Sequence, residues 1–257
     1  MRNLNRLSIG SSVDAIDILT QKKQLILRPR FNAEIAFALG MLINSLCLCL
    51  LIKSSFGVST LSSVPLVLSL IFTKLSLGTW TTIIQTLTVI ILVLVTRQPR
   101  IGYLLSFAVG VVFGLMVDLF SPLINALPDG LPFQILYFIF GFTGMSFGAA
   151  LFILCRLPIM PFDTFVRDFS FYTGMSVKKV KTIYDALSVG ISLTLSFTFL
   201  HRMAGVGLGT ILCIFLVGRL TQWFKQKLES RWDFKVTTKV GTWLAHTVEI
   251  HSAEPLR

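Results

Sequence analysis

The sequence predicts an all-α membrane protein with six transmembrane helices, arranged as a 3+3 inverted repeat with two broken, re-entrant half-helix segments. Hydrophobic residues make up 54% of the 257 residues and charged residues only 14%, whereas soluble domains carry roughly a quarter charged residues. Several apolar runs approach the roughly 20 residues that a helix needs to cross a bilayer. The two halves of the chain also resemble each other. This composition excludes an ordinary soluble enzyme and a disordered chain.

The chain divides into three parts. The polar segment 1–33 has apolar residues at helical spacing between Ile9 and Leu19, which predicts a short helix either on the membrane surface or packed in solvent on the loops. A transmembrane domain is predicted over 34–224, and a polar tail over 225–257. The predicted spans are about 34–52, 80–96, 101–120, 133–154, 183–200 and 205–224.

The distribution of basic residues predicts the orientation. With both termini inside, twenty of the 23 Lys and Arg residues fall on the inner side and only Lys53, Lys74 and Arg202 fall outside. Basic residues gather in cytoplasmic loops of membrane proteins. The net charge of +11 is therefore explained by orientation, and we expect no nucleic-acid partner.

The two halves, about 34–120 and 133–224, align at shifts of about one hundred residues. The aligned pairs include Gly40 with Gly141, Ser45 with Ser146, Ser76 with Ser176, and Gly114 with Gly218. Three spans in each repeat would invert the second half relative to the first. Many transporters are built in this way, with sites near the membrane midplane on discontinuous helices.

Two stretches are predicted to be half-helices instead of spans. The stretch 56–72 is apolar, but its counterpart 157–168 contains two prolines and three charged residues. Since a charge at the centre of a membrane helix costs roughly 3 kcal/mol, 157–168 is not expected to cross. Symmetry assigns the same form to 56–72, on the opposite side of the membrane.

Four segments carry a resemblance to a known family. Phe56–Ser59 and Leu75–Trp80 resemble the first-half motifs of the YczE/YitT-like bacterial membrane protein family, a turn after the first span and the opening of the second. Leu157–Asp163 is similar to the same turn and retains a proline and the acid, and Gly205–Thr210 resembles the opening of the last span. The resemblance implies a multi-pass protein of the bacterial inner membrane, with no agreed biochemical activity.

The chain departs from the family pattern in both halves. Thr60, Leu61 and Ser62 stand where the family has Pro-Trp-Asp, and Lys178 and Lys179 replace Gly-Thr. If the two turns build one site together, the acid is retained only on the second side.

Six residues near the half-helices form the predicted substrate site: Ser59, Ser62, Trp80, Pro161, Asp163 and Arg167. Ser59 and Ser62 would lie at a helix N-terminus, where free amides and the helix dipole favour an anionic or polar group, although ordinary N-capping explains them equally well. Asp163 and Arg167 are four residues apart and share a helix face. They offer a carboxylate and a fork of donors, or alternatively a salt bridge at the headgroups.

The remaining polar and small residues have structural interpretations. Asp118 and Asp185 fall near span ends and are expected to be solvated, while Gln85 is expected to join helices. The glycine pairs Gly110–Gly114 and Gly144–Gly148 would permit close helix packing within the chain. The four cysteines lie in apolar stretches without metal-ligand spacing, and no catalytic motif occurs. We therefore expect no enzyme, no metal and no cofactor.

The expected function is a small-molecule permease that binds a small polar or anionic solute between the two repeats. The expected partners are the lipid bilayer and that solute. An alternative is a non-transporting accessory or regulatory protein that binds a protein partner at its cytoplasmic face. A third alternative is the substrate-binding subunit of a vitamin importer, although such subunits lack this repeat.

The predicted topology can be tested by thiol labelling. A cysteine at position 129 should react with an impermeant reagent from outside the cell, and one at position 230 should not, because Asp129 and Ser230 lie on opposite sides of the predicted bundle. Equal external labelling at both positions would contradict the orientation.

Overall fold

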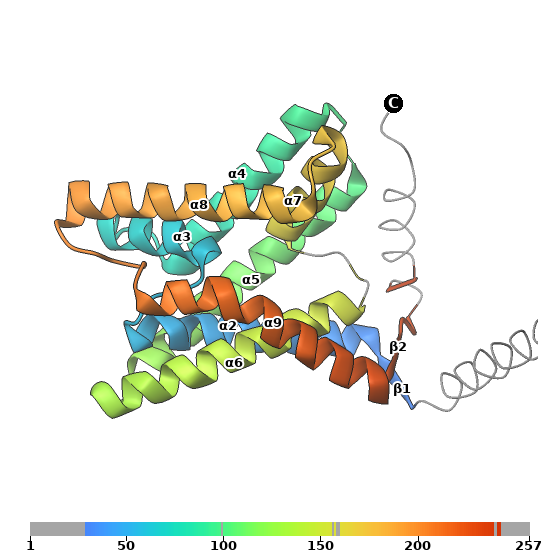
Figure 1. Ribbon diagram of the computed structural model, residues 1–257, viewed down its shortest axis with the longest axis horizontal. Coiled ribbons are helices and arrows are strands. Elements are labelled where there is room, and N and C mark those ends of the chain that lie inside the picture. Colours follow the sequence, from blue (N-terminus) through green and yellow to red (C-terminus); the bar gives the residue numbers. More distant parts are fainter. Residues whose placement is uncertain (1–28, 99, 156, 158–159, 239–240, 243–257) are drawn as a thin grey trace, which may run out of the picture.

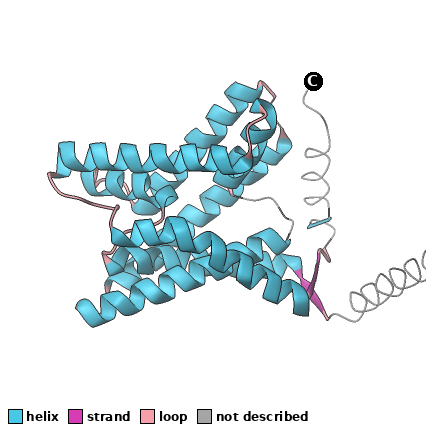
Figure 2. Cartoon of the chain, in the orientation of Figure 1, coloured by secondary structure: helices cyan, strands magenta, loops and turns pink. Residues whose placement is uncertain are grey.

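The computed structural model describes residues 29–98, 100–155, 157, 160–238 and 241–242, and this part of the chain is almost entirely helical (Figure 2). The helices are α2 (Ala33–Ser54), α3 (Thr60–Ile71), α4 (Leu77–Thr96), α5 (Ile101–Asn125), α6 (Leu131–Cys155), α7 (Pro161–Thr173), α8 (Val177–Leu195) with its π-helical extension η1 (Ser196–Leu200), and α9 (Leu208–Arg231). The predicted helical class is confirmed. The helix predicted between Ile9 and Leu19 lies outside the described residues.

Among the described residues, five helices are long and apolar enough to cross a membrane, namely α2, α4, α5, α6 and α8 with η1. They identify the chain as a membrane protein. The predicted sixth span corresponds to α9, which has 24 residues but is not among the five. Arg219 lies in its middle and Lys225, Lys227 and Arg231 follow, so its apolar part is shorter than a typical span of about 20 residues.

The helices form two connected groups (Figure 1). In the first, α2 packs along α6, with α5 against α2 and α9 against α6. In the second, α3 packs against α8 and α4, and α7 packs against α4 and α8. The two groups are joined by the contact of α4 with α5 and by smaller contacts of α7 with α5 and of α3 with α9.

Small residues let α2 and α6 approach closely. A methyl group added at Gly141 would lie 3.0 Å from the carbonyl oxygen of Cys47, and one at Gly148 would collide with the Asn44 carboxamide. Asn44 Nδ2 in turn donates to the carbonyl of Gly40 at 2.9 Å. The predicted role of the 144–148 glycine pair in packing within the chain is confirmed, since Gly144 lies against Cys47.

Asp118 fastens the start of α4 to α5, so the expectation that it is simply solvated was wrong. Its carboxylate accepts from the amide of Gly78 at 2.7 Å and from the hydroxyl of Ser76 at 2.6 Å. A carboxylate at a helix N-terminus satisfies free amides and complements the helix dipole. Gly78 and Gly114 meet at the same crossing, where neither has space for a side chain.

The two ends of the described chain pair with each other, which the sequence did not predict. Strand β1 (Arg30–Asn32) runs parallel to β2 (Asp233–Lys235). Glu34, at the start of α2, accepts from the amides of Thr237 and Thr238 at 3.1 and 2.9 Å. The segment after α9 is therefore tied to the beginning of α2.

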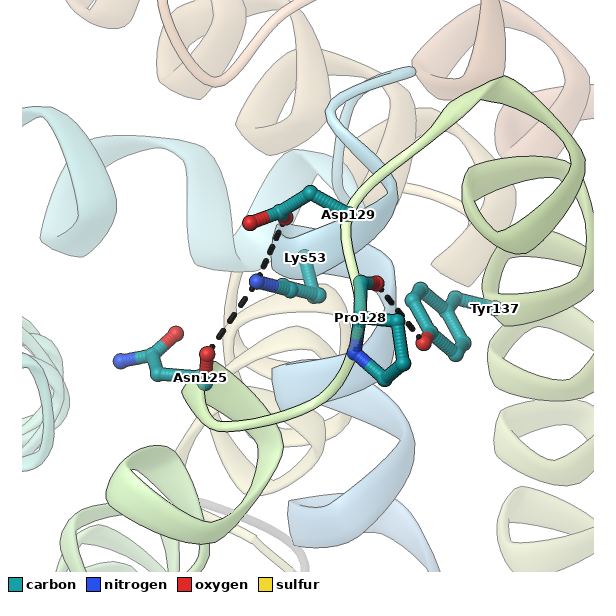
Figure 3. Close-up of polar contacts among 5 residues, drawn as sticks. All are labelled: Lys53, Asn125, Pro128, Asp129 and Tyr137. Carbon is teal, nitrogen blue, oxygen red and sulfur yellow. Dashed lines mark hydrogen bonds and ion pairs between the residues drawn. The ribbon is translucent and has the colours of Figure 1, made fainter.

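The loop between α5 and α6 is held against the end of α2 (Figure 3). Lys53 Nζ lies 2.6 Å from Asp129 and donates to the carbonyl of Asn125 at 3.2 Å. The Tyr137 hydroxyl donates to the carbonyl of Pro128 at 3.0 Å. The lysine side chain is only 12% exposed and that of Asp129 is 81% exposed, so the acid lies on the surface over a largely covered cation.

The glycine crossing between α4 and α5 gives a stability prediction. In Gly114→Ala the new methyl group would lie 2.6 Å from the Gly78 carbonyl oxygen, so we expect a loss of about 1–3 kcal/mol from overpacking. In the control Gly190→Ala, where nothing lies within 4 Å, stability should be unchanged or higher. The free energy of unfolding in detergent measures both, and equal behaviour would contradict this packing.

Candidate functional site

The segment between α2 and α3 is hydrogen-bonded, through its backbone, to the segment around the start of α9. The Val58 amide donates to the carbonyl of Gly205 at 3.1 Å, and the Gly209 amide donates to the carbonyl of Phe56 at 2.8 Å. Gly57 has a φ of +117°, and a side chain there would lie 2.6 Å from the Thr210 hydroxyl. Two of the four segments that carry the family resemblance, Phe56–Ser59 and Gly205–Thr210, are thus in direct contact.

Thr60, the first residue of α3, forms a hydrogen bond with Asp185 of α8. Its hydroxyl donates to Asp185 Oδ1 at 2.7 Å. Ser59 is the N-cap residue, but its hydroxyl donates to Ser62 Oγ at 3.3 Å instead of capping the helix. Asp185 is the ninth residue of α8 and half-buried, so the expectation that it is a solvated residue near a span end was wrong.

At the start of α7, Pro161 is buried and occupies the first helical position, where the missing N–H costs nothing. It borders Gly110 of α5 together with Gln85 of α4. Oε1 of Gln85 is buried and has no hydrogen-bond partner among the described residues. Gln85 is the ninth residue of α4, so both short helices begin beside the interior of a long one.

The two starts lie close together around one aromatic cluster. Leu61 of α3 packs against a buried group formed by Phe162 and Val166 of α7 and Val180 of α8. The Tyr184 ring lies 4.7 Å from that of Phe162. The short helices α3 and α7 therefore contact the same cluster, to which α8 also contributes.

Charged side chains surround this junction. Asp163 is exposed, and the positively charged side chains of Lys181 and Arg167 are near enough to interact with its carboxylate. Lys181 Nζ lies 4.9 Å from the centroid of the Phe162 ring. Arg167 is paired with the neighbouring Asp168 at 2.6 Å, so the salt bridge at this face joins Arg167 to Asp168.

Trp80 lies away from the other predicted site residues. Its ring packs 5.7 Å from Phe72, which follows the last residue of α3, whereas Ser59 precedes the first. Twelve helical residues separate the two by about 18 Å at 1.5 Å per residue. The indole N–H is buried without a partner in the described part of the chain.

Sequence reasoning missed Thr60 and Asp185 as a pair, and one signal could have found them. The shift of 100 that aligns Ser76 with Ser176 also places Gln85 opposite Asp185. Both serines cap their helices, accepting from the amides of Thr79 and Lys179. Because both helices begin directly after a capping serine, Gln85 and Asp185 are each the ninth residue of their helix.

This arrangement supplies two helix N-termini, a carboxylate bonded to a hydroxyl, and a second carboxylate beside two cations. Such groups can hold a polar molecule with charges of either sign. Within the described residues, no three His, Cys, Asp or Glu side chains gather as metal ligands do. All four cysteines are buried and unpaired.

The fold defines a helical membrane protein with two short helices, α3 and α7, between its long ones. The chain belongs to a family of unknown function, DUF6198, whose sequence model matches residues 31–226. The chain matched no curated protein and no solved structure in these comparisons.

A double-mutant cycle can test the Thr60–Asp185 contact. Hydrogen bonds to charged groups contribute about 1.5–3 kcal/mol, so Thr60→Val and Asp185→Ala should each destabilise the protein and should show a coupling energy of that size. Thr194→Val removes a hydroxyl that bonds only within α8 and should not couple to Asp185→Ala. Additive effects of Thr60→Val and Asp185→Ala would rule out the contact.

Proposed function

We propose that the protein is a small-molecule permease of the bacterial inner membrane that binds a small polar or anionic solute between two inverted repeats. The observation that carries this proposal is the meeting of α3 and α7. Each begins beside the interior of a long helix, and their first turns share one cluster with ionisable groups around it. Intramembrane ionisable groups and discontinuous helices mark substrate sites in transporters.

The helix contacts support the inverted repeat. The packing of α2 on α5 has its counterpart in α6 on α9, and that of α3 on α8 in α7 on α4. At a shift of 101, Thr60 and Ser63 of α3 correspond to Pro161 and Thr164 of α7. Contacts that recur between corresponding elements are expected of two related halves. The contact of α4 with α5 has no strong counterpart between α8 and α9, so the repeat is imperfect.

The proposed topology has six spans, with α9 as the last and both termini in the cytoplasm. The positive-inside distribution supports it, and Arg219, which is exposed, would extend toward the inner headgroups. The resemblance of Phe56–Ser59 and Gly205–Thr210 to the YczE/YitT-like family also supports this placement, since those two segments pack on each other.

The chemistry at the junction favours a zwitterionic or anionic solute. The first turns of α3 and α7 present free amides, which attract anionic groups. Lys181 and Arg167 add positive charge, and Asp163 supplies a carboxylate for a cationic group. The aromatic rings of Phe162 and Tyr184 would cover the apolar part of such a molecule.

A second candidate is an accessory protein that acts through a partner at its cytoplasmic face. The pairing of β1 with β2 favours it, because it orders the segment after α9 beside the start of α2. Flux through the purified protein separates the two candidates, since an accessory protein would carry none.

Uptake into proteoliposomes tests the permease and the site together. With a panel of labelled small zwitterions and organic anions, at least one should enter vesicles that contain the wild type. Loss of a charge-assisted contact in Asp163→Asn should lower that uptake about tenfold or more without unfolding the protein, because Asp163 is exposed.

Ser59→Ala should reduce the same uptake, and the control Asp233→Asn, in β2, should retain it. Full uptake in both Asp163→Asn and Ser59→Ala would place the site elsewhere. No uptake of any solute would favour the accessory protein.

A further inference from the structure

One ridge of α9 is exposed along its length. Residues four apart on a helix form such a ridge, and five exposed residues follow this spacing: Ile211, Phe215, Arg219, Trp223 and Lys227. Another side of the helix packs against α6 (Figure 1). We call these five residues the α9 ridge. Its first two members are apolar, and cations flank the tryptophan in the rest.

The basic half of the α9 ridge lies at one end of the bundle. Leu228, next to Lys227, packs in a cluster with Ala33 and Leu151, at the start of α2 and near the end of α6. In the proposed topology this end faces the cytoplasm. Tryptophan is enriched where a membrane helix meets the headgroups. The ridge therefore changes from apolar to basic as α9 approaches the inner interface.

Two positive charges come together around Trp223. The ammonium of Lys227 lies 4.7 Å from the centroid of the Trp223 ring. The lysine side chain is thus directed one turn back along α9, as helical side chains tend to be, and toward Arg219. Arg219 lies one turn before the same tryptophan. An anion beside the indole ring could contact both cations.

The protein supplies no anion to these two cations. Within the described residues, neither Arg219 nor Lys227 forms a salt bridge. Glu229, the one acid of α9, lies two residues after Lys227 and so on a different face. A side chain added at Gly218 would meet nothing within 4 Å, so no described segment covers the surface next to Arg219.

We propose that the α9 ridge binds an anionic phospholipid, with the phosphate between Arg219 and Lys227 and an acyl chain along Phe215 and Ile211. The order of groups along the ridge matches that of a lipid in the inner leaflet, with hydrocarbon deeper and phosphate at the interface. Arginine can hold a phosphate by two hydrogen bonds, and the indole ring suits the boundary between the two regions.

Charge complementarity favours an anionic over a zwitterionic lipid. The headgroup of a zwitterionic lipid carries its own cation, which compensates the phosphate, whereas the two cations of the ridge have no anion of their own. Basic residues at the membrane surface attract anionic lipids in this way. The inference rests on the placement of α9 in the bilayer and is independent of transport.

Quenching of Trp223 by brominated lipid tests the proposal. A variant that retains Trp223 alone (Trp80→Phe, Trp232→Phe, Trp243→Phe) is reconstituted in phosphatidylcholine vesicles. Part of the lipid is replaced by phosphatidylglycerol or phosphatidylcholine with the same brominated acyl chain. Half-maximal quenching should need an at least about fivefold lower mole fraction of the brominated phosphatidylglycerol, since each cation favours anionic lipid by about that factor.

Arg219→Gln should lower this preference about fivefold, and Arg219→Gln combined with Lys227→Gln should abolish it. Both side chains are exposed, so the fold should be retained. The control Lys74→Gln removes an exposed charge from the loop before α4 and should keep the full preference. Native mass spectrometry of the chain with all its tryptophans, in a mixture of the two lipids, makes the same comparison if the single-tryptophan variant does not fold.

Equal quenching by the two lipids, or a preference that survives the double substitution, would overturn the proposal. Weak quenching by both lipids would also overturn it, because Trp223 would then be covered by protein, such as a second copy of the chain. None of these outcomes bears on solute uptake, so the lipid site and the permease are tested separately.

Discussion

The close packing of α2 against α6 determines where the short helices α3 and α7 begin. Both helices lead directly into the breaks that precede α3 and α7, so their contact fixes where the two half-helices can begin. The approach depends on glycines in α6 that leave no space for side chains, with Gly141 against Cys47 and Gly148 against Asn44. Within lipid the hydrophobic effect does not drive helices together, so van der Waals contact at these small residues provides much of the force.

The chain segments before α3 and α7 leave backbone groups without helical partners, and local contacts satisfy part of them. Ending a helix inside a bilayer exposes amides and carbonyls that lipid cannot satisfy, at a cost of several kcal/mol each. The segment Phe56–Val58 meets this need by pairing with the backbone of Gly205–Gly209. Pro161 meets it differently, because it has no amide hydrogen to satisfy. The amides that remain at the two helix starts are the groups that a solute could use.

Length and apolar character predicted the long helices well, because five runs are each long enough to need no tertiary information. The ends of the helices were harder to predict from the sequence. α5 continues to Asn125 through Pro122, and α9 extends to Arg231 although its last turns are charged. That 56–72 does not form a full-length helix was predicted only through comparison of the two halves, since Thr60–Ile71 alone is as apolar as a span.

Tertiary contacts between distant segments could not be predicted in this way. Asp185 is bonded by a hydroxyl 125 residues away, and Asp118 caps a helix that begins 41 residues before it. Trp80 was placed with Ser59 because both lie near the first half-helix, but the length of α3 separates them. Similarly, Arg167 had two acids within reach on one helix, and only packing decides that Asp168 is its partner.

The pairing of β1 with β2 bears on how the protein is made. A ribosome delivers β1 first and β2 after the entire membrane domain, and the two strands pair in parallel across about 200 residues. Until β2 emerges, β1 and the carboxylate of Glu34 lack the partners that this segment provides. This small sheet can therefore form only after α9 has been synthesised.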